Sequence, residues 1–421
     1  MAPMHPDTLQ ILAAVLFALA IAHTFASGWL LRLAHHSPRH GGALHLLGEV
    51  ECVFGLWALV LVVCMALLQG TTPAVEYLEQ RSYIEPLFVF AVMVVAATRP
   101  VLTLSRRAVD VVAHVLPGNP AVSGYFATLC LLPLLGSFIT EAAAMTVAAL
   151  VLRDRLYAAG PSTRLQYATL GVLLVNVSIG GTLTNFAAPP VLMVAGTWGW
   201  DNAYMLNHFG WRAALAVVVN ALLVTLMFRR ELTSLVPATE TTHVLPPLWS
   251  TLLTLLFLVG VVVFAHHPPV FLGLLLFFIG FAKAYPQHQD RLIVREALLV
   301  GFFLAGLVVL GGLQQWWLQP LLKGMDVGAV FYGTTLLTAI TDNAALTYLA
   351  SLVEGLDEDF KRAIVAGAVT GGGLTVIANA PNPAAFAMLK NRFEGHTIKP
   401  ALLLRAALLP TAVAIVAFRL I

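Results

Sequence analysis

The chain has 421 residues, of which 59% are hydrophobic and only 10% are charged, and its net charge is +2. Soluble domains carry about 25% charged residues, so this composition excludes a water-soluble protein. The small net charge gives no support to a nucleic-acid partner. The cysteines Cys52, Cys64 and Cys130 lie in apolar stretches without paired or metal-ligand spacing, so neither a disulfide framework nor a zinc site is indicated.

Long apolar runs separated by short polar breaks predict membrane-spanning helices along the chain. The first run is too long for a signal-peptide core, so we interpret it as the first span. In the first half we expect spans at 9–33, 44–68 and 83–98, an amphipathic surface helix at 101–116, an apolar stretch with one charge at 121–152, an uncharged stretch at 165–200, and a span at 208–228.

The same order of elements returns after a polar linker at 229–246. A surface segment with paired glutamines and tryptophans takes the place of the amphipathic helix. In the second half we expect spans at 249–265, 269–284 and 294–312, the surface segment from Gln314 to Trp317, an apolar stretch with one charge at 327–353, an uncharged stretch at 363–389, and a last span at 400–421.

Two motifs recur in the same order in the two halves. Phe-Ile-Thr-Glu-Ala-Ala-Ala-Met-Thr at 138–146 aligns with Ala-Ile-Thr-Asp-Asn-Ala-Ala-Leu-Thr at 339–347, and Gly-Gly-Thr-Leu-Thr at 180–184 aligns with Gly-Gly-Gly-Leu-Thr at 371–375. This pattern predicts an internal repeat. The expected fold is an all-α polytopic membrane protein with repeats at 1–228 and 247–421. Each repeat has about five transmembrane helices, one re-entrant hairpin (121–152 or 327–353) and one glycine-broken helix (165–200 or 363–389).

The charge distribution predicts an orientation. An odd number of spans in each half turns the second half upside down relative to the first, as in many secondary transporters. With both termini outside and the central linker in the cytoplasm, all but six of the 23 Lys and Arg residues fall on the cytoplasmic side. We therefore expect a multi-pass protein of the bacterial inner membrane. The six exceptions are Arg81, Arg212, Lys323, Lys361, Arg362 and Arg419.

Glu141 and Asp342 occupy equivalent places at the two predicted hairpin tips. A carboxylate at membrane depth costs about 2.5–3.5 kcal/mol on insertion scales unless it meets water, a cation or a proton. Such a group is suited to binding a cation in one state and a proton in another. The alternative is a carboxylate that caps backbone amides or points into bulk water.

The glycine motifs predict unwound backbone in the middle of the membrane, where exposed carbonyls and helix ends bind ions. Neutral side-chain oxygens surround both motifs and suit a hard monovalent cation. The alternative is a kink whose Thr and Ser side chains bond to their own helix. The expected ligands are Asn176, Ser178, Gly180, Gly181, Thr182, Thr184 and Asn185 in the first half, and Gly371, Gly372, Gly373, Thr375, Asn379 and Asn382 in the second.

Other ionisable residues are weaker candidates. Glu85 and Glu296 sit at matching places at the starts of two spans, where an acid usually serves as a partner of the helix dipole. Glu49, Glu51 and His23 lie in or near the first two spans, and the sequence assigns them no role.

The two motifs resemble those of the ion transporter superfamily, which includes divalent-anion/sodium symporters, arsenite efflux pumps and one type of sodium/proton antiporter. Residues 340–347 look like the acidic hairpin motif of the antiporter and arsenite branches, and residues 179–190 look like their first broken helix. The segment Leu-Leu-Gly-Glu-Val-Glu-Cys-Val-Phe-Gly-Leu-Trp at 46–57 is similar to the N-terminal part of a bacterial family named putative sodium/proton antiporters.

The resemblance implies that each hairpin tip faces its own broken helix. By that comparison Thr140, Glu141 and Thr146 face Gly180–Asn185, while Asp342, Asn343 and Thr347 face Gly371–Thr375 and Asn379, and Thr341 joins the ion-binding candidates. It also implies an elevator-like motion and a homodimer. The acidic tips depart from the neutral Ser-Asn-Thr tips of the dicarboxylate branch, which argues against a dicarboxylate substrate.

These features favour sodium/proton exchange, with sodium and protons as transported ions and no cofactor. The alternative is sodium- or proton-coupled transport of a small anion, an oxyanion or a carboxylate. An anion site needs fixed positive charge or helix N-termini. No Lys or Arg lies in the two predicted hairpins (121–152 and 327–353) or in the two predicted broken helices (165–200 and 363–389). A membrane enzyme or a channel is a third possibility, but the sequence has no nucleophile or metal motif that would support it. The sequence also has no P-loop, so ATP-driven transport is not indicated.

Overall fold

The computed structural model describes residues 7–37, 40–235 and 245–420, and within these residues the ordered elements are all helices. The outermost residues and nine residues of the predicted central linker, 236–244, lie outside this part of the chain. The first half contains α1 (Thr8–His36), α2 (Gly41–Gly48), α3 (Val50–Gln69), α4 (Thr71–Glu79), α5 (Ile84–Ala96), α6 (Arg99–Val115), α7 (Pro120–Ile139), α8 (Glu141–Arg155), α9 (Thr163–Gly180), α10 (Pro189–Trp198), α11 (Asn202–Met205), α12 (Trp211–Met227) and α13 (Arg229–Ser234).

The second half begins after the linker and has nine α-helices among its described residues. They are α14 (Leu248–Val263), α15 (Pro268–Ala284), α16 (Val294–Gly311), α17 (Gln315–Lys323), α18 (Val327–Thr338), α19 (Asn343–Ser351), α20 (Glu358–Gly371), α21 (Asn382–Leu389) and α22 (Pro400–Arg419).

Seven helices in the described residues are long and apolar enough to cross a membrane, so this is a multi-pass membrane protein. The pair α5 and α6 would add an eighth span, but it bends by 69° at its break. Three further apolar helices are shorter, namely α14, α15 and α18. The seven are Thr8–Leu31, Cys52–Gln69, Pro120–Ile139, Thr163–Leu183, Asn202–Met227, Val294–Gly311 and Pro400–Arg419.

The predicted span at 44–68 is wrong as a single helix, because α2 and α3 are separated at Glu49. Gly48 packs so closely on α1 that a Cβ atom there would lie 2.7 Å from Leu31 Cγ. The Glu49 carboxylate binds the Arg295 guanidinium at 2.5 Å, which ties the break to α16. The short helix α4 that follows α3 was not expected from the sequence.

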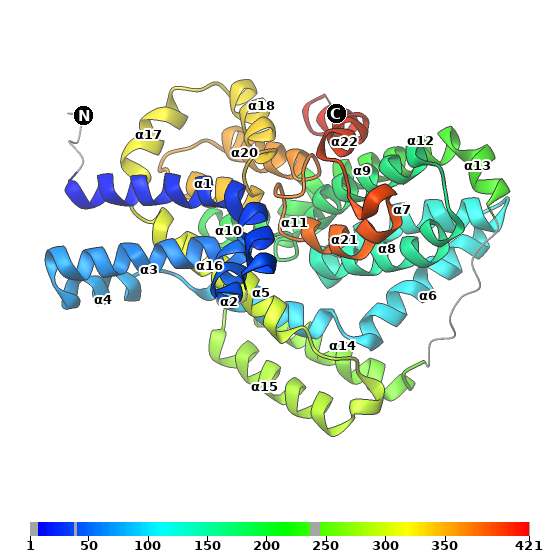
Figure 1. The fold of residues 1–421 in the computed structure, drawn as a ribbon, viewed down its shortest axis with the longest axis horizontal. Coiled ribbons are helices and arrows are strands. Elements are labelled where there is room, and N and C mark those ends of the chain that lie inside the picture. The colour runs from blue at the N-terminus through cyan, green and yellow to red at the C-terminus, as the bar shows by residue number, and fades with distance from the viewer. Residues whose placement is uncertain (1–6, 38–39, 236–244, 421) are drawn as a thin grey trace.

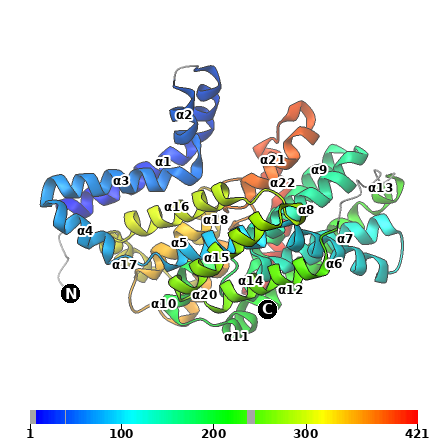
Figure 2. The same cartoon turned by 90° about the horizontal axis from the view of Figure 1, so that it is seen from below.

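The helices form two packed groups. In one group α3 lies along α16, and α16 lies along α5, with Phe54 packed edge-on against Phe303. In the other, α7 and α12 pack on α9, which also packs on α22. Figure 1 places the first group on one side of the molecule and the second on the other, and in Figure 2 α2 and the adjoining end of α1 stand out from the body.

The helix α9 crosses the end of α20, and two glycines that follow α20 lie directly against α9. A Cβ atom on Gly373 would overlap the backbone of Val175, and one on Gly372 would overlap the Ser178 hydroxyl. Each helix ends at its glycine motif, α9 at Gly180 and α20 at Gly371. A 3-10 turn, Gly181–Leu183, and then non-helical chain lie between α9 and α10, and non-helical chain lies between α20 and α21. This crossing places the second glycine motif against α9, shortly before the first motif begins.

Candidate functional site

The first hairpin tip is a sharp turn at Thr140, between α7 and α8. Thr140 has φ 76° and ψ 149°, a conformation that few non-glycine residues adopt. Its hydroxyl accepts a hydrogen bond from the Ala143 backbone N–H at 3.4 Å. The two helices pack against each other closely enough that a Cβ on Gly136 would contact Ala144 at 3.2 Å. The strained turn places Glu141 as the first residue of α8.

Glu141 is buried, with 1% of its surface exposed. Its Oε2 accepts a hydrogen bond of 2.8 Å from the Asn379 side-chain amide. Its side chain lies against Gly181, where a Cβ atom would come within 2.6 Å of Oε1. Among the described residues Oε1 has no hydrogen-bond partner. A buried carboxylate oxygen in this state needs a proton, a cation or a water molecule.

Two buried amides also have polar atoms without a partner among the described residues, and one of them, Asn379, contacts Glu141. The Oδ1 atom of Asn379 and both amide atoms of Asn343 make no hydrogen bond to any described residue. The Asn343 backbone N–H donates to the Ala378 carbonyl at 3.1 Å, so the chain before Asn379 lies on the second hairpin tip. Asn379 therefore contacts Glu141, and the residue before it contacts the second tip at Asn343. Carboxylate and amide oxygens are ligands for hard cations.

Asp342 at the second tip has a different environment from Glu141. It is the N-cap residue of α19, and its Oδ1 accepts hydrogen bonds from the backbone N–H groups of Ala344 and Ala345 at 2.8 and 3.2 Å. Glu141 instead lies one position inside its helix, and Thr140 provides the cap. The aligned acids therefore sit in unequal places, and Asp342 performs the capping role that the sequence left as an alternative.

Three of the threonines named from the sequence bond to their own helices. Thr146 donates to the Ala142 carbonyl at 2.9 Å, Thr182 to Ile179 at 2.7 Å, and Thr347 to Ala344 at 3.1 Å. This is the back-bonding that polar side chains make in apolar helices. Thr146 also lines a cavity beside Glu141. The remaining predicted threonine of the second tip, Thr341, is half-buried and immediately precedes Asp342.

Other polar residues join each hairpin tip to its broken helix. Thr184 donates to the Ser137 carbonyl at 2.6 Å, and Thr375 donates to the Ala339 carbonyl at 2.8 Å. Ser137, which the sequence analysis does not name as a ligand, also donates to the Gly180 carbonyl at 2.7 Å. The two threonines end the aligned glycine motifs, so each half holds its tip and its break together by a similar bond.

Two more polar groups stabilise the second break and the crossing. The Asn382 amide donates to the carbonyls of Gly372 and Thr375, both at 2.8 Å. Ser178 donates to the Val369 carbonyl at 2.7 Å and so ties α9 to α20.

Asn176 and Asn185 lie elsewhere. Asn176 donates to the carbonyls of Leu129 and Val217 and accepts a bond of 2.9 Å from Asn220, so it joins α7, α9 and α12. Asn220 was not named from the sequence, although a single amide in an apolar helix is a recognisable signal. Asn185 donates to the Trp200 carbonyl at 2.9 Å. Neither predicted ligand contacts Glu141.

The glycines of the two motifs serve a different purpose from the expected unwinding. Gly180, Gly181 and Gly372 have helical dihedrals, with φ of −67°, −74° and −62°. A side chain at Gly180 would lie 2.6 Å from the Pro133 carbonyl, and one at Gly371 would overlap the Thr335 carbonyl. The motif glycines permit close approach of α7 to α9 and of α18 to α20, and the unwound backbone follows them.

A cavity of about 340 Å³ lies beside Glu141. Its walls come from α5, α8, α16, α21 and the non-helical segment before α10, and they are mainly apolar. Glu296 on α16 also lines this cavity, although the sequence assigned it to the helix dipole. No Lys or Arg is among the lining residues that the structure describes: Val89, Val92, Met93, Thr140, Glu141, Ala142, Thr146, Phe186, Ala187, Pro189, Ile293, Glu296, Val300, Ala380, Pro381, Pro383, Ala384 and Met388.

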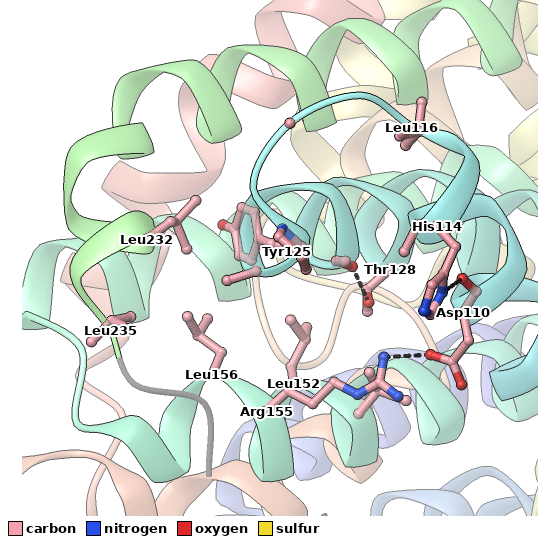
Figure 3. A pocket seen from close by; sticks show the side chains of 16 residues that line it. Asp110, His114, Leu116, Tyr125, Thr128, Leu152, Arg155, Leu156, Leu232 and Leu235 are labelled. Carbon is pink, nitrogen blue, oxygen red and sulfur yellow. Dashed lines mark hydrogen bonds and ion pairs between the residues drawn. The ribbon is translucent and has the colours of Figure 1, made fainter. Parts of the chain in front are cut away.

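A separate cavity of about 470 Å³ lies between α6, α7, α8 and α13 and contains none of the predicted ligands (Figure 3). An ion pair joins Arg155 to Asp110 at 2.7 Å, and leucine side chains form much of the remaining wall. We do not assign the ion site to this cavity, because its carboxylate, Asp110, is paired with Arg155.

The remaining ionisable candidates have local partners. Glu49 binds Arg295 and lies 3.4 Å from His45, and Glu85 accepts a bond of 3.1 Å from Ser82. His23 contacts Trp57 and the Leu47 carbonyl. The Glu51 side chain lies outside the described residues. Across the described part of the chain, no three His, Cys, Asp or Glu residues are grouped to hold a metal ion.

Comparison with known proteins gives one match. A family model described as "Putative Na+/H+ antiporter" matches residues 8–421, nearly the whole chain. No curated protein matches the chain.

Proposed function

The chain belongs to the family described as putative Na+/H+ antiporters, and from that premise we propose that it exchanges sodium ions for protons across a membrane. Membership makes it a transporter of small ions rather than an enzyme. The exchange is secondary active transport, in which the gradient of one ion drives the movement of the other.

The observation that carries the proposal is the state of the Glu141 carboxylate. It is buried, one oxygen is held by Asn379, and the other has no partner among the described residues. In one state a sodium ion occupies the free oxygen, with Asn379 Oδ1 and the Asn343 amide as neutral ligands. In the other state a proton occupies it. Because the two ions exclude each other, one carboxylate couples the two fluxes.

We assign the principal role to Glu141 and a supporting role to Asp342. One carboxylate oxygen of Asp342 accepts hydrogen bonds from two backbone N–H groups of α19, as a helix cap does. Its negative charge at the second tip still favours a cation nearby. This assignment makes the ion site unequal in its two halves, although the motifs are related.

The repeated packing supports an inverted-repeat fold. The pair α7 and α9 corresponds to α18 and α20, and the contact of α8 with α21 corresponds to that of α19 with α10. On this basis we propose re-entrant hairpins at α7–α8 and α18–α19 and an elevator-like motion of the ion site. With this proposal we keep three predictions from the sequence: both termini lie outside, the protein resides in the bacterial inner membrane, and it forms a homodimer.

The alternative is coupled transport of a small anion. Such a site needs a fixed positive charge. The cavity beside Glu141 has two carboxylates and no Lys or Arg among its described lining residues. This arrangement supports a cation as the transported ion.

The test is exchange in everted membrane vesicles from cells without their own sodium/proton exchangers. A preset pH gradient is followed while sodium, lithium or potassium is added. We expect sodium to collapse the gradient only in vesicles that contain this chain. The proposal fails if none of the three cations has an effect between about pH 6 and pH 9. A carboxylate with a strongly perturbed pKa would titrate in this range.

A further inference from the structure

The cavity beside Glu141 has a second carboxylate at its exposed end. Glu296 lies in the first turn of α16 and is exposed, whereas Glu141 on the same cavity is buried. Arg295, the adjacent residue, binds Glu49 at 2.5 Å on the α3 side, so its charge is already engaged. The walls of the same cavity include Val92, Met93 and Val300.

The matching acid, Glu85, lines a different cavity. That cavity measures about 400 Å³ and includes Asn185, Asn202 and His266, but not Glu141. Phe186 lines both cavities and packs edge-on against Phe88, with ring centroids 6.5 Å apart. The two cavities therefore meet at an aromatic side chain, and only the one with Glu296 includes Glu141.

We propose that Glu296 is the entry residue that attracts monovalent cations into the cavity and delivers them to Glu141. This inference rests on the proposed function and adds to it the route of the ion. A carboxylate at the mouth of a cavity with low-dielectric walls focuses the field and raises the local concentration of cations. A position in the first helical turn alone would not indicate such a role. The independent observation is the buried, partnerless Glu141 oxygen on the same cavity.

The first experiment measures the field in the cavity without relying on transport. Cys52, Cys64 and Cys130 are replaced, and Ala142→Cys introduces a single thiol on the cavity wall next to Glu141. Purified protein is treated at low ionic strength with a cationic or an anionic methanethiosulfonate reagent. We expect Glu296→Gln to lower the ratio of cationic to anionic labelling rates about fivefold, the size of one nearby charge in a water-filled space.

Glu85→Gln is the matched control, because Glu85 is also a first-turn acid but lies on the other cavity. It should leave the labelling ratio at Ala142→Cys unchanged. Thr146→Cys lines the same cavity and replaces the first probe if that variant does not fold. An equal ratio with and without the Glu296 carboxylate overturns the proposal, and so does an equal effect of both substitutions.

The second experiment measures sodium dependence in the vesicles. Glu296→Gln should raise the half-saturating sodium concentration about three- to tenfold while the maximal rate stays within twofold, because a charge at the mouth changes delivery rather than occupancy. Complete loss of exchange with normal protein content would instead place Glu296 in the ion site and overturn the entry role. If the wild type exchanges no cation, the proposed function fails, and the labelling ratio still decides what Glu296 does.

Discussion

Asn379 and Glu141 are 238 residues apart in the chain, and the Asn379 amide donates a 2.8 Å hydrogen bond to the Glu141 carboxylate. Asn379 belongs to the second half and Glu141 to the first. This bond joins the hairpin tip of one half to the segment after the glycine motif of the other, within the ion site that we propose.

Replacing Asn379 tests the neutral ligand. We expect Asn379→Ala to lower the apparent sodium affinity by about tenfold or more, since a hydrogen bond to a charged group contributes about 1.5–3 kcal/mol. The measurement is the half-saturating sodium concentration in vesicles. Asn185→Ala is the matched control, because that amide bonds to Trp200 and not to Glu141. Equal effects of the two substitutions would contradict the assigned ligand.

The two acidic tips should respond differently to loss of charge. Asp342→Asn keeps a good N-cap for α19, so we expect it to retain more sodium-dependent exchange than Glu141→Gln. Asp342→Ala removes the cap and should lower stability by about 1 kcal/mol. Exchange rates and thermal unfolding of purified protein separate the two effects. If Asp342→Asn is as inactive as Glu141→Gln, both acids hold the ion.

The crossing of α9 and α20 should not tolerate a side chain. A Cβ on Gly373 would overlap the Val175 backbone, which cannot move aside as a flexible side chain can. We expect Gly373→Ala to cost about 1–3 kcal/mol or more. Gly280→Ala on α15 is the control, because nothing lies within 4 Å of the added atom. Thermal stability in detergent measures both, and equal melting temperatures would contradict the close crossing.

Acid should weaken one contact at the start of α20, where Trp200 and Tyr204 both donate to Glu358. Burial alone would raise the pKa of Glu358, but hydrogen bonds from Lys361, Tyr204 and Trp200 hold the pKa below its usual value. A lowered pKa gives stability that is present above the ordinary carboxyl range and is lost as the pH falls through the folded value.

We therefore expect Glu358→Gln to melt slightly below the wild type at pH 7, by an amount worth at most about 1 kcal/mol for so exposed a group. The difference should disappear in acid. A difference that grows as the pH falls would contradict the sign of this pKa change.

The sequence predicted the positions of the helix breaks well, because glycine motifs and single charges are local signals. The helices α9 and α20 end at Gly180 and Gly371, inside the two uncharged stretches expected to be broken. The break before α3 was missed, because Gly48 and Glu49 act through contacts with α1 and α16 that only the fold creates.

The partners in the site were harder to predict from the sequence. The family resemblance implied that Asn379 faces Asp342, whereas its amide bonds to Glu141. Asn176 looked like a ligand because it is polar in an apolar stretch, yet three buried partners occupy its amide. Glu296 looked like any first-turn acid until the cavity joined it to Glu141. Each of these relations depends on packing between distant segments.

Proton release on sodium binding tests the central claim most directly. Purified protein in a weakly buffered solution receives sodium chloride, with choline chloride as the salt control, while the pH is recorded. If sodium and a proton exclude each other at Glu141, the wild type and the exposed-acid control Glu394→Gln should release up to about one proton per sodium bound, and Glu141→Gln should release none. Sodium-dependent release that persists in Glu141→Gln would contradict the account.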